Sequence, residues 1–243
     1  MLATFLPLLT ALMLGFLHAL EVDHMIAVTT FVSGRPALSD AARFGFRWGV
    51  GHSAAVMVLG GVLLVSGIQW PARYDAVGEG LVGAMLIGLG LWALRSGRVL
   101  HLHPPEQHGD HAHLHVHGHA HDGHDHPHQP PQREEHVHHD GHDHRHHHGH
   151  GVTLVGLLHG LAGSSAVVAL LPVTLIGRLD VGFAYLLVFG AGVTAGMVCY
   201  ALVAAFAIRR AAARSVALGR RLSQAVGVAG VVVGGWWVSR AVG

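Results

Sequence analysis

Charged residues are scarce in this 243-residue chain and lysine is absent, so that all 15 basic side chains are arginines. Only 12% of the residues are charged, whereas soluble globular domains carry about a quarter. The charges fall in short clusters between long uncharged runs, a distribution that excludes an ordinary soluble domain. The formal net charge of +1 gives no indication of a nucleic-acid partner.

Cysteine occurs once, as Cys199. A single cysteine excludes an internal disulfide and a cluster of thiolate ligands. Any metal site in this chain must therefore use nitrogen and oxygen ligands.

Long apolar runs are abundant instead. A helix of about 18 or more apolar residues can cross a hydrocarbon core of about 30 Å. We therefore predict an all-α polytopic protein of a bacterial inner membrane, with six transmembrane helices. A signal peptide is the alternative for the first run. A signal peptide requires a positively charged segment before its apolar run, but no arginine or lysine precedes Arg35. The runs are Met1–Leu20, Trp48–Arg73, Gly80–Leu94 (extended to start near Ala76), Gly151–Gly177, Val181–Ile208 and Leu222–Ser239.

The placement of the arginines predicts an orientation, because cytoplasmic loops carry an excess of basic residues. Loops after the first, third and fifth predicted spans hold ten arginines near the membrane, against three on the other side. This asymmetry predicts that both termini lie outside and that the loop after the third span is cytoplasmic. The ten are Arg35, Arg43, Arg47, Arg95, Arg98, Arg209, Arg210, Arg214, Arg220 and Arg221; the three are Arg73, Arg178 and Arg240.

The two halves of the chain resemble each other at an offset of 141 residues. Leu17–Leu20 aligns with Leu158–Leu161, and Trp48–Gly51 aligns with Phe189–Gly192. Near the last span of each half the offset drifts to 144, which pairs Gly83 with Gly227.

Each half holds three predicted spans, and duplicated units with an odd number of spans must be inverted relative to each other. Inverted repeats are typical of secondary transporters, whose substrate site lies near the membrane midplane between the repeats. We predict a first three-helix repeat at 1–99, a disordered cytoplasmic loop at 100–150 and a second three-helix repeat at 151–243.

Ionisable and hydroxyl side chains lie within the apolar runs, where burying them is costly and usually serves a function. At the positions equivalent to Asp23, His24 and His52, the second half has Ser164, Ser165 and Val193. The first half therefore supplies most candidate ligands. The candidate metal ligands are His18, Glu21, Asp23, His24, His52 and, more weakly, His159, which is equally a candidate gate or packing residue.

Helix geometry limits which ligands can converge. On one continuous helix His18, Glu21 and His24 share a face, whereas Asp23 points away. Either Asp23 orients an imidazole by hydrogen bonding, or the helix is broken here. Imidazole and carboxylate ligands suit Ni²⁺, Co²⁺, Zn²⁺ and Cu²⁺ better than Ca²⁺ and Mg²⁺.

Three segments resemble motifs of the nickel/cobalt transporter superfamily. His18–His24 is similar to its His-x4-Asp-His signature, Gly51–Ser53 to its Gly-His-Ser motif, and Leu158–Ser165 to its His-Gly-Leu-Ala-Gly-Ser segment. By this resemblance the functional positions fall on His18, Asp23, His24 and His52.

The resemblance implies Ni²⁺ permeation, or Co²⁺ next, without ATP hydrolysis, and the compact layout is similar to the branch linked to urease maturation. We expect uptake that supplies metalloenzymes. The expected partners are the metal ion, the lipid bilayer and a cytosolic metallochaperone, with no nucleic acid and no bound cofactor.

Residues 101–150 contain 21 of the 25 histidines, interspersed with Asp, Gly and Pro. Such a segment cannot bury apolar surface and should be disordered. Histidine-rich tracts bind divalent metals, so this loop fits a reservoir, a collector for export, a sensor or a buffer that transport does not need.

Two other functions remain open at this stage. Metal efflux for resistance uses the same ligands in the opposite direction. A membrane hydrolase is the enzymatic alternative, either a serine protease using His159 with Ser164 or Ser165, or a catalytic zinc held by the first-half ligands. The repeat and the histidine-rich loop favour transport and a chain that is not an enzyme.

Overall fold

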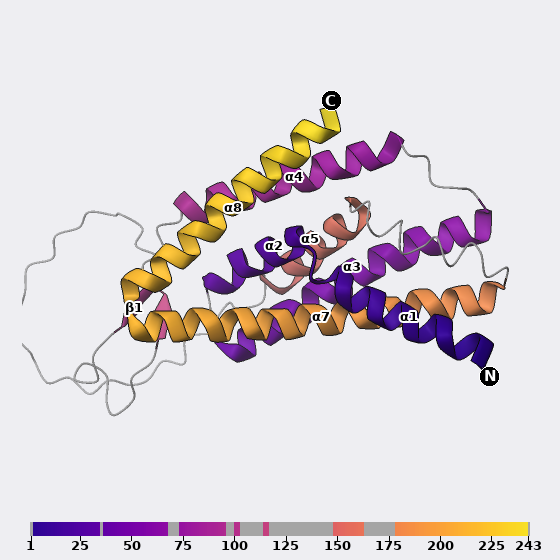
Figure 1. The fold of residues 1–243 in the computed structure, drawn as a ribbon, viewed down its shortest axis with the longest axis horizontal. Coiled ribbons are helices and arrows are strands. Elements are labelled where there is room, and N and C mark those ends of the chain that lie inside the picture. The colour runs from indigo at the N-terminus through magenta and orange to yellow at the C-terminus, as the bar shows by residue number, and fades with distance from the viewer. Residues whose placement is uncertain are drawn as a thin grey trace, which may run out of the picture.

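The computed structural model describes residues 2–34, 36–67, 73–95, 100–102, 114–116, 148–162 and 178–242. Within these ranges the chain forms helices joined by short turns, with one pair of three-residue strands (Figure 1). The helices are α1 (Leu2–His18), α2 (Val22–Ser33), α3 (Leu38–Ser66), α4 (Arg73–Arg95), α5 (His148–Ala162), α7 (Leu179–Arg214) and α8 (Val216–Val242), and the strands are β1 (Leu100–Leu102) and β2 (Leu114–Val116).

Four helices of the described chain, α3, α4, α7 and α8, are long and apolar enough to cross a membrane. The bent pair α1–α2 makes a fifth candidate span. Helix α5 has 15 residues, which is shorter than one crossing, and the remainder of the predicted span Gly151–Gly177 lies outside the described residues. The protein is thus a multi-pass membrane protein with four to five candidate spans, and six spans are not confirmed.

The helix is broken between His18 and His24, which is one of the two alternatives that the sequence left open. Helix α1 ends at His18 and α2 starts at Val22, with a 56° bend between them. Two short-range bonds tighten the end of α1, from the Leu20 amide to the Leu17 carbonyl at 2.9 Å and from the Glu21 amide to the His18 carbonyl at 3.1 Å. They satisfy backbone groups that a helix terminus would otherwise leave without partners.

The helices pack in pairs that combine the two halves of the chain. Helix α3 lies along α7 and α4 lies along α8, while α1 packs on α7 and α5 packs on α3. Glycines permit this close approach: a Cβ on Gly90 would lie 2.5 Å from the Gly227 carbonyl oxygen. Small residues at such contacts let membrane helices approach backbone to backbone.

Large apolar side chains cover the outer surface of the helices. Leu187, Val203 and Val62 are 65%, 64% and 59% exposed. In a soluble protein so many exposed aliphatic residues would mark an interaction surface. On helices of spanning length they form the face that contacts lipid, while Trp48, Phe189 and four histidines lie inside.

The predicted loop at 100–150 is described only at its edges. Strands β1 and β2 pair antiparallel, with Leu100 opposite Val116, and α5 begins at His148. The remainder of the segment, which holds most of its histidines, lies outside the described residues, so its predicted disorder stays a prediction.

Candidate metal site

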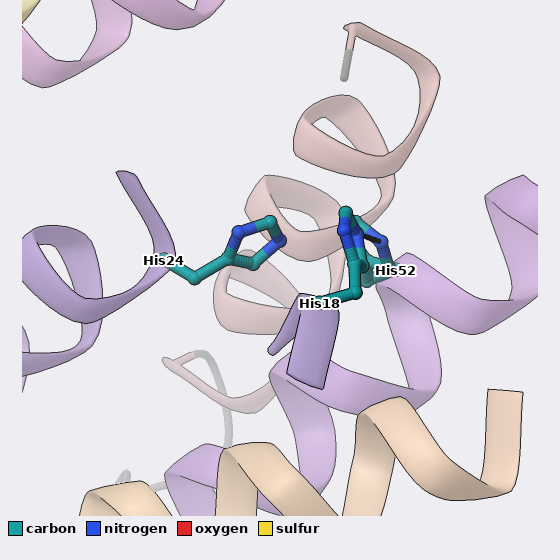
Figure 2. Close-up of side chains that lie close together, drawn as sticks. All are labelled: His18, His24 and His52. Carbon is teal, nitrogen blue, oxygen red and sulfur yellow. Dashed lines mark hydrogen bonds between the residues drawn. The ribbon is translucent and has the colours of Figure 1, made fainter. Parts of the chain in front are cut away.

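Every histidine outside residues 101–150 lies in one buried cluster. His18, His24, His52 and His159 are at most 5% exposed, although they come from four different helices, α1, α2, α3 and α5. The potential ligand atoms of His18, His24 and His52 all lie within 4.8 Å of one another, and Figure 2 shows how the three rings lie. A second group, from Asp23, His24 and His159, meets the same limit.

The break between α1 and α2 positions the first two candidate ligands. His18 ends α1 and His24 lies in the first turn of α2, so the bend turns their side chains toward each other, with ring centroids 4.7 Å apart. A continuous helix would have separated them by nearly two turns, about 9 Å along its axis.

Close packing of α5 on α3 brings in the other two histidines. A Cβ on Gly51 would overlap the Thr153 carbonyl oxygen, and a Cβ on Gly160 would lie 2.7 Å from the His52 carbonyl oxygen. Only glycine fits at either position. The glycines that flank His52 and His159 therefore determine how closely these two imidazoles approach.

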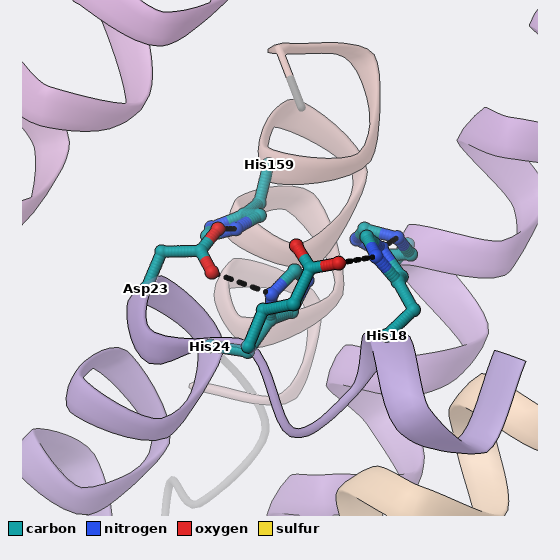
Figure 3. Close-up of polar contacts among 6 residues, drawn as sticks. His18, Asp23, His24 and His159 are labelled. Carbon is teal, nitrogen blue, oxygen red and sulfur yellow. Dashed lines mark hydrogen bonds and ion pairs between the residues drawn. The ribbon is translucent and has the colours of Figure 1, made fainter. Parts of the chain in front are cut away.

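Carboxylates hold three of the rings by hydrogen bonds (Figure 3). Asp23 accepts at both oxygens, from His24 Nδ1 at 3.0 Å and from His159 Nε2 at 2.8 Å. Glu21 accepts from His18 Nδ1 at 3.0 Å. A carboxylate on one ring nitrogen fixes the tautomer and leaves the lone pair of the other nitrogen for a metal.

The remaining nitrogens face one another or lack a partner. His18 Nε2 lies 3.1 Å from His52 Nε2. Among the described residues, nothing bonds to His24 Nε2, His52 Nδ1 or His159 Nδ1. Buried polar atoms normally find partners, so these nitrogens indicate a site that a ligand completes.

The spacing of the nitrogens suits a transition-metal ion. Two imidazole nitrogens at about 2.1 Å from one ion, at right angles, lie about 3.0 Å apart. The separation of 3.1 Å between His18 Nε2 and His52 Nε2 is close to that value. His24 approaches both rings, with its centroid 4.7 Å from His18 and 5.0 Å from His52, so a small inward shift would complete a three-nitrogen site.

The structure brings together all six residues that the sequence proposed as ligands. Asp23 bonds His24 and His159, so the hydrogen-bonding role that the sequence left open for it agrees with the structure. Ser164 and Ser165 lie outside the described residues. The sequence analysis did not propose Trp48 as a residue of the site, although its ring centroid lies 5.8 Å from His159. The alignment of Trp48 with Phe189 was the signal that could have identified both as equivalent positions.

Two curated proteins are similar to this chain. The first, "Urease accessory protein UreH" of Bacillus sp. (strain TB-90), is 29% identical over 200 residues, which cover 79% of this chain and 75% of the relative. The second, "Putative nickel/cobalt efflux system MJ1092" of Methanocaldococcus jannaschii, is 33% identical over 106 residues, 42% of this chain and 47% of the relative. No family model and no solved structure matches the chain.

The name of the second relative, a nickel/cobalt efflux system, agrees with the resemblance to the nickel/cobalt transporter superfamily that the three sequence motifs carry. The relatives are named as transport or accessory proteins and not as enzymes, which fits a transporter rather than a hydrolase. They also support metal-ion transport, without deciding between uptake and efflux.

Proposed function

We propose that this multi-pass membrane protein of the nickel/cobalt transporter type moves Ni²⁺, with Co²⁺ as the next candidate, through the buried cluster of His18, His24 and His52. The observation that carries the proposal is the convergence of these imidazoles, from α1, α2 and α3, on one point inside the helices. Charged and ionisable groups at membrane depth are costly and typically line a substrate path.

The ligand chemistry supports the choice of metal. Neutral imidazoles bind Ni²⁺, Co²⁺, Zn²⁺ and Cu²⁺ well and bind Ca²⁺ and Mg²⁺ poorly. The three rings replace part of the hydration shell of the ion, while Asp23 and Glu21, bonded to the outer nitrogens of His24 and His18, partly balance its charge. Nickel and cobalt are preferred over zinc and copper because one relative is named as a nickel/cobalt efflux system, and nickel is placed first because of the resemblance to the branch linked to urease maturation.

We propose six spans arranged as an inverted repeat of 1–99 and 151–243. Reciprocal contacts between the halves support it. A Cβ on Gly192 would overlap the Leu12 carbonyl oxygen, and adding or subtracting 141 turns this pair into Gly51 and Thr153, which make the same contact.

A second reciprocal contact involves α4 and α8. A Cβ on Gly234 would lie 2.5 Å from the Gly83 carbonyl oxygen, and one on Gly90 would lie 2.5 Å from the Gly227 carbonyl oxygen. At the offset of 144, Gly90 is equivalent to Gly234 and Gly83 is equivalent to Gly227, so each contact is the counterpart of the other. Ser53 and Thr194, which are 141 residues apart, lie 3.3 Å from each other, as residues beside a pseudo-twofold axis would. Rocking of one repeat against the other would then alternate access to the site.

One end of the molecule, here called the arginine-rich end, carries most of the described basic residues. It consists of the start of α3, the end of α4 and the junction of α7 with α8, which lie together at the left of Figure 1. We propose that this end is cytoplasmic, because basic loops are retained there. Its described arginines are Arg43, Arg47, Arg95, Arg209, Arg210, Arg214, Arg220 and Arg221; Arg35 and Arg98 lie outside the described residues.

We propose uptake as the direction, with the histidine-rich segment at 100–150 receiving the ion in the cytoplasm and passing it to a metallochaperone. Export is the second candidate, favoured by the efflux function in the name of one relative. In that case the same segment would collect ions for removal.

The test is ⁶³Ni accumulation in a bacterium that lacks its own nickel transporters. We expect the wild type to accumulate nickel above the empty vector and the variant His24→Ala to lose this gain. The control Cys199→Ser removes an exposed soft ligand on α7 and should match the wild type. Accumulation below the empty vector that depends on His24 would reverse the direction, and no dependence on His24 in either sense would refute the proposal.

A further inference from the structure

His24 belongs to two groups of potential ligands, one with His18 and His52 and one with Asp23 and His159. We propose that Asp23, His24 and His159 form a second metal station that overlaps the first, and that the ion leaves Nε2 of His24 in the first station and then binds Nδ1 of the same ring in the second. This inference rests on the proposed transport function and extends it, because it assigns His159 of the second repeat as a transport ligand.

The two nitrogens of His24 serve different groups. Nδ1 lies 3.0 Å from Asp23, while the tip of the ring points toward His18 and His52 (Figure 2), where Nε2 has no partner among the described residues. The ring lies between the two other histidines, with its centroid 4.7 Å from His18 and 4.3 Å from His159.

Because both stations use His24, only one of them can hold an ion at a time. A neutral imidazole carries one hydrogen and offers one lone pair. When Nε2 of His24 binds an ion, its Nδ1–H bonds to Asp23. When Nδ1 binds the ion, water that enters with the ion takes the hydrogen from Nδ1 and returns one to Nε2. The ring gains and loses no net proton, and one chain holds one ion at a time.

The second station mirrors the first across the repeat. His18 and His159 are equivalent at the offset of 141, and each ring packs on an equivalent aromatic residue: His18 lies 5.7 Å from Phe189, and His159 lies 5.8 Å from Trp48, centroid to centroid. Each repeat thus contributes one outer ligand, and the first repeat contributes the shared one.

The aromatic neighbours of His18 and His159 indicate how the two stations are ordered between the ends of the molecule. Helix α3 starts at the arginine-rich end, so Trp48 lies nearer that end than His52, by one turn or about 6 Å. Helix α7 runs toward the arginine-rich end, so Phe189 lies nearer its other end. The His159 station is therefore displaced toward the arginine-rich end, and the His18 station toward the opposite side.

The hydrogen-bond geometry of Asp23 shows what the second station requires. Its two oxygens already contact His24 Nδ1 and His159 Nε2 at 3.0 and 2.8 Å (Figure 3). An ion that takes the place of these two hydrogens, which move through water to Nε2 of His24 and Nδ1 of His159, meets one carboxylate and two imidazoles, a ligand set suited to the same metals.

The experiment uses the full-length protein with the histidines of residues 101–147 changed to asparagine, so that bound metal reports the buried ligands. Equilibrium binding of ⁶³Ni²⁺ to purified protein is combined with Ni²⁺ flux into vesicles. The test variants are His18→Gln and His159→Gln, alone and together, because glutamine keeps a hydrogen-bond donor while binding metal weakly. The control Tyr185→Phe removes a buried hydroxyl that has no partner among the described residues.

We expect one ion per chain in the parent protein, in the control and in each single variant, because each single variant retains one station. The double variant should bind none. Flux should fall at least tenfold in both single variants and stay unchanged in the control. Matching thermal unfolding midpoints would show that the variants are folded.

Loss of all binding in His18→Gln, wild-type flux in His159→Gln, or two ions per chain would each overturn the second station while leaving transport through the first intact. Absence of flux in the parent protein would instead refute the proposed function, on which the second station depends.

Discussion

The substitution Asp23→Asn should weaken metal binding by about 10- to 100-fold, the usual cost of losing a hydrogen-bonded partner of a metal ligand, or about 1.4–2.7 kcal/mol. The structure places this residue at the upper part of that range. Asp23 is 2% exposed and accepts from two imidazoles. An asparagine at this position can accept from one ring only, and its amide group turns a donor toward the other.

Glu21→Gln is the matched comparison. Glu21 bonds one imidazole, His18, and its side chain is 39% exposed, so water can replace the carboxylate. We expect a loss of about 1 kcal/mol, a factor of about five. The assay is competition for Ni²⁺ with a fluorescent chelator, using purified protein without the histidines of 101–147. Binding by Asp23→Asn within twofold of the parent, or a larger loss in Glu21→Gln, would refute the assignment of Asp23 as the main orienting carboxylate.

Three further predictions concern the fold, the loop and the orientation. Gly51→Ala should cost about 1–3 kcal/mol through overpacking against Thr153, whereas Gly88→Ala, with open space around it, should not destabilise; equal thermal unfolding midpoints would contradict this. Replacing the histidines of 101–147 should reduce the bound nickel while vesicle flux stays above half, and abolished flux would show that transport needs the segment. In a Cys199→Ser background, Ser215→Cys at the junction of α7 and α8 should react with an impermeant maleimide in inverted vesicles only; labelling of intact cells would reverse the orientation.

The sequence was sufficient to single out the residues that the structure brings into one buried cluster, because a bilayer makes the burial of ionisable groups costly; their role as ligands stays a prediction. His18 and His52 lie within predicted apolar runs and His24 lies just after the first of them, and a break after His18 was one of two alternatives that the crowding of candidate ligands left open. The bonding of Asp23 to His159 was not predictable, because it joins residues 136 positions apart through the packing of α5.

The spans were predicted only in part. Hydropathy located α3, α4, α7 and α8, but the ends of α3 and α7 extend beyond the apolar runs into arginine-containing segments, where no hydrophobic boundary marks the helix end. The first predicted span also omitted α2, whose polar start at Asp23 and His24 interrupts the apolar pattern. Helix α2 is nevertheless stable, because Ala27, Val28 and Val32 are buried against its neighbours.

The central claim is that the buried histidine cluster carries the ion, and the most direct test is Ni²⁺ flux into vesicles that contain the purified protein alone, without ATP. We expect flux with the wild type and with Cys199→Ser, and at least a tenfold loss with His24→Ala, which removes the ligand common to both groups. Wild-type flux in folded His24→Ala, or no flux above empty vesicles in the wild type, would contradict the account.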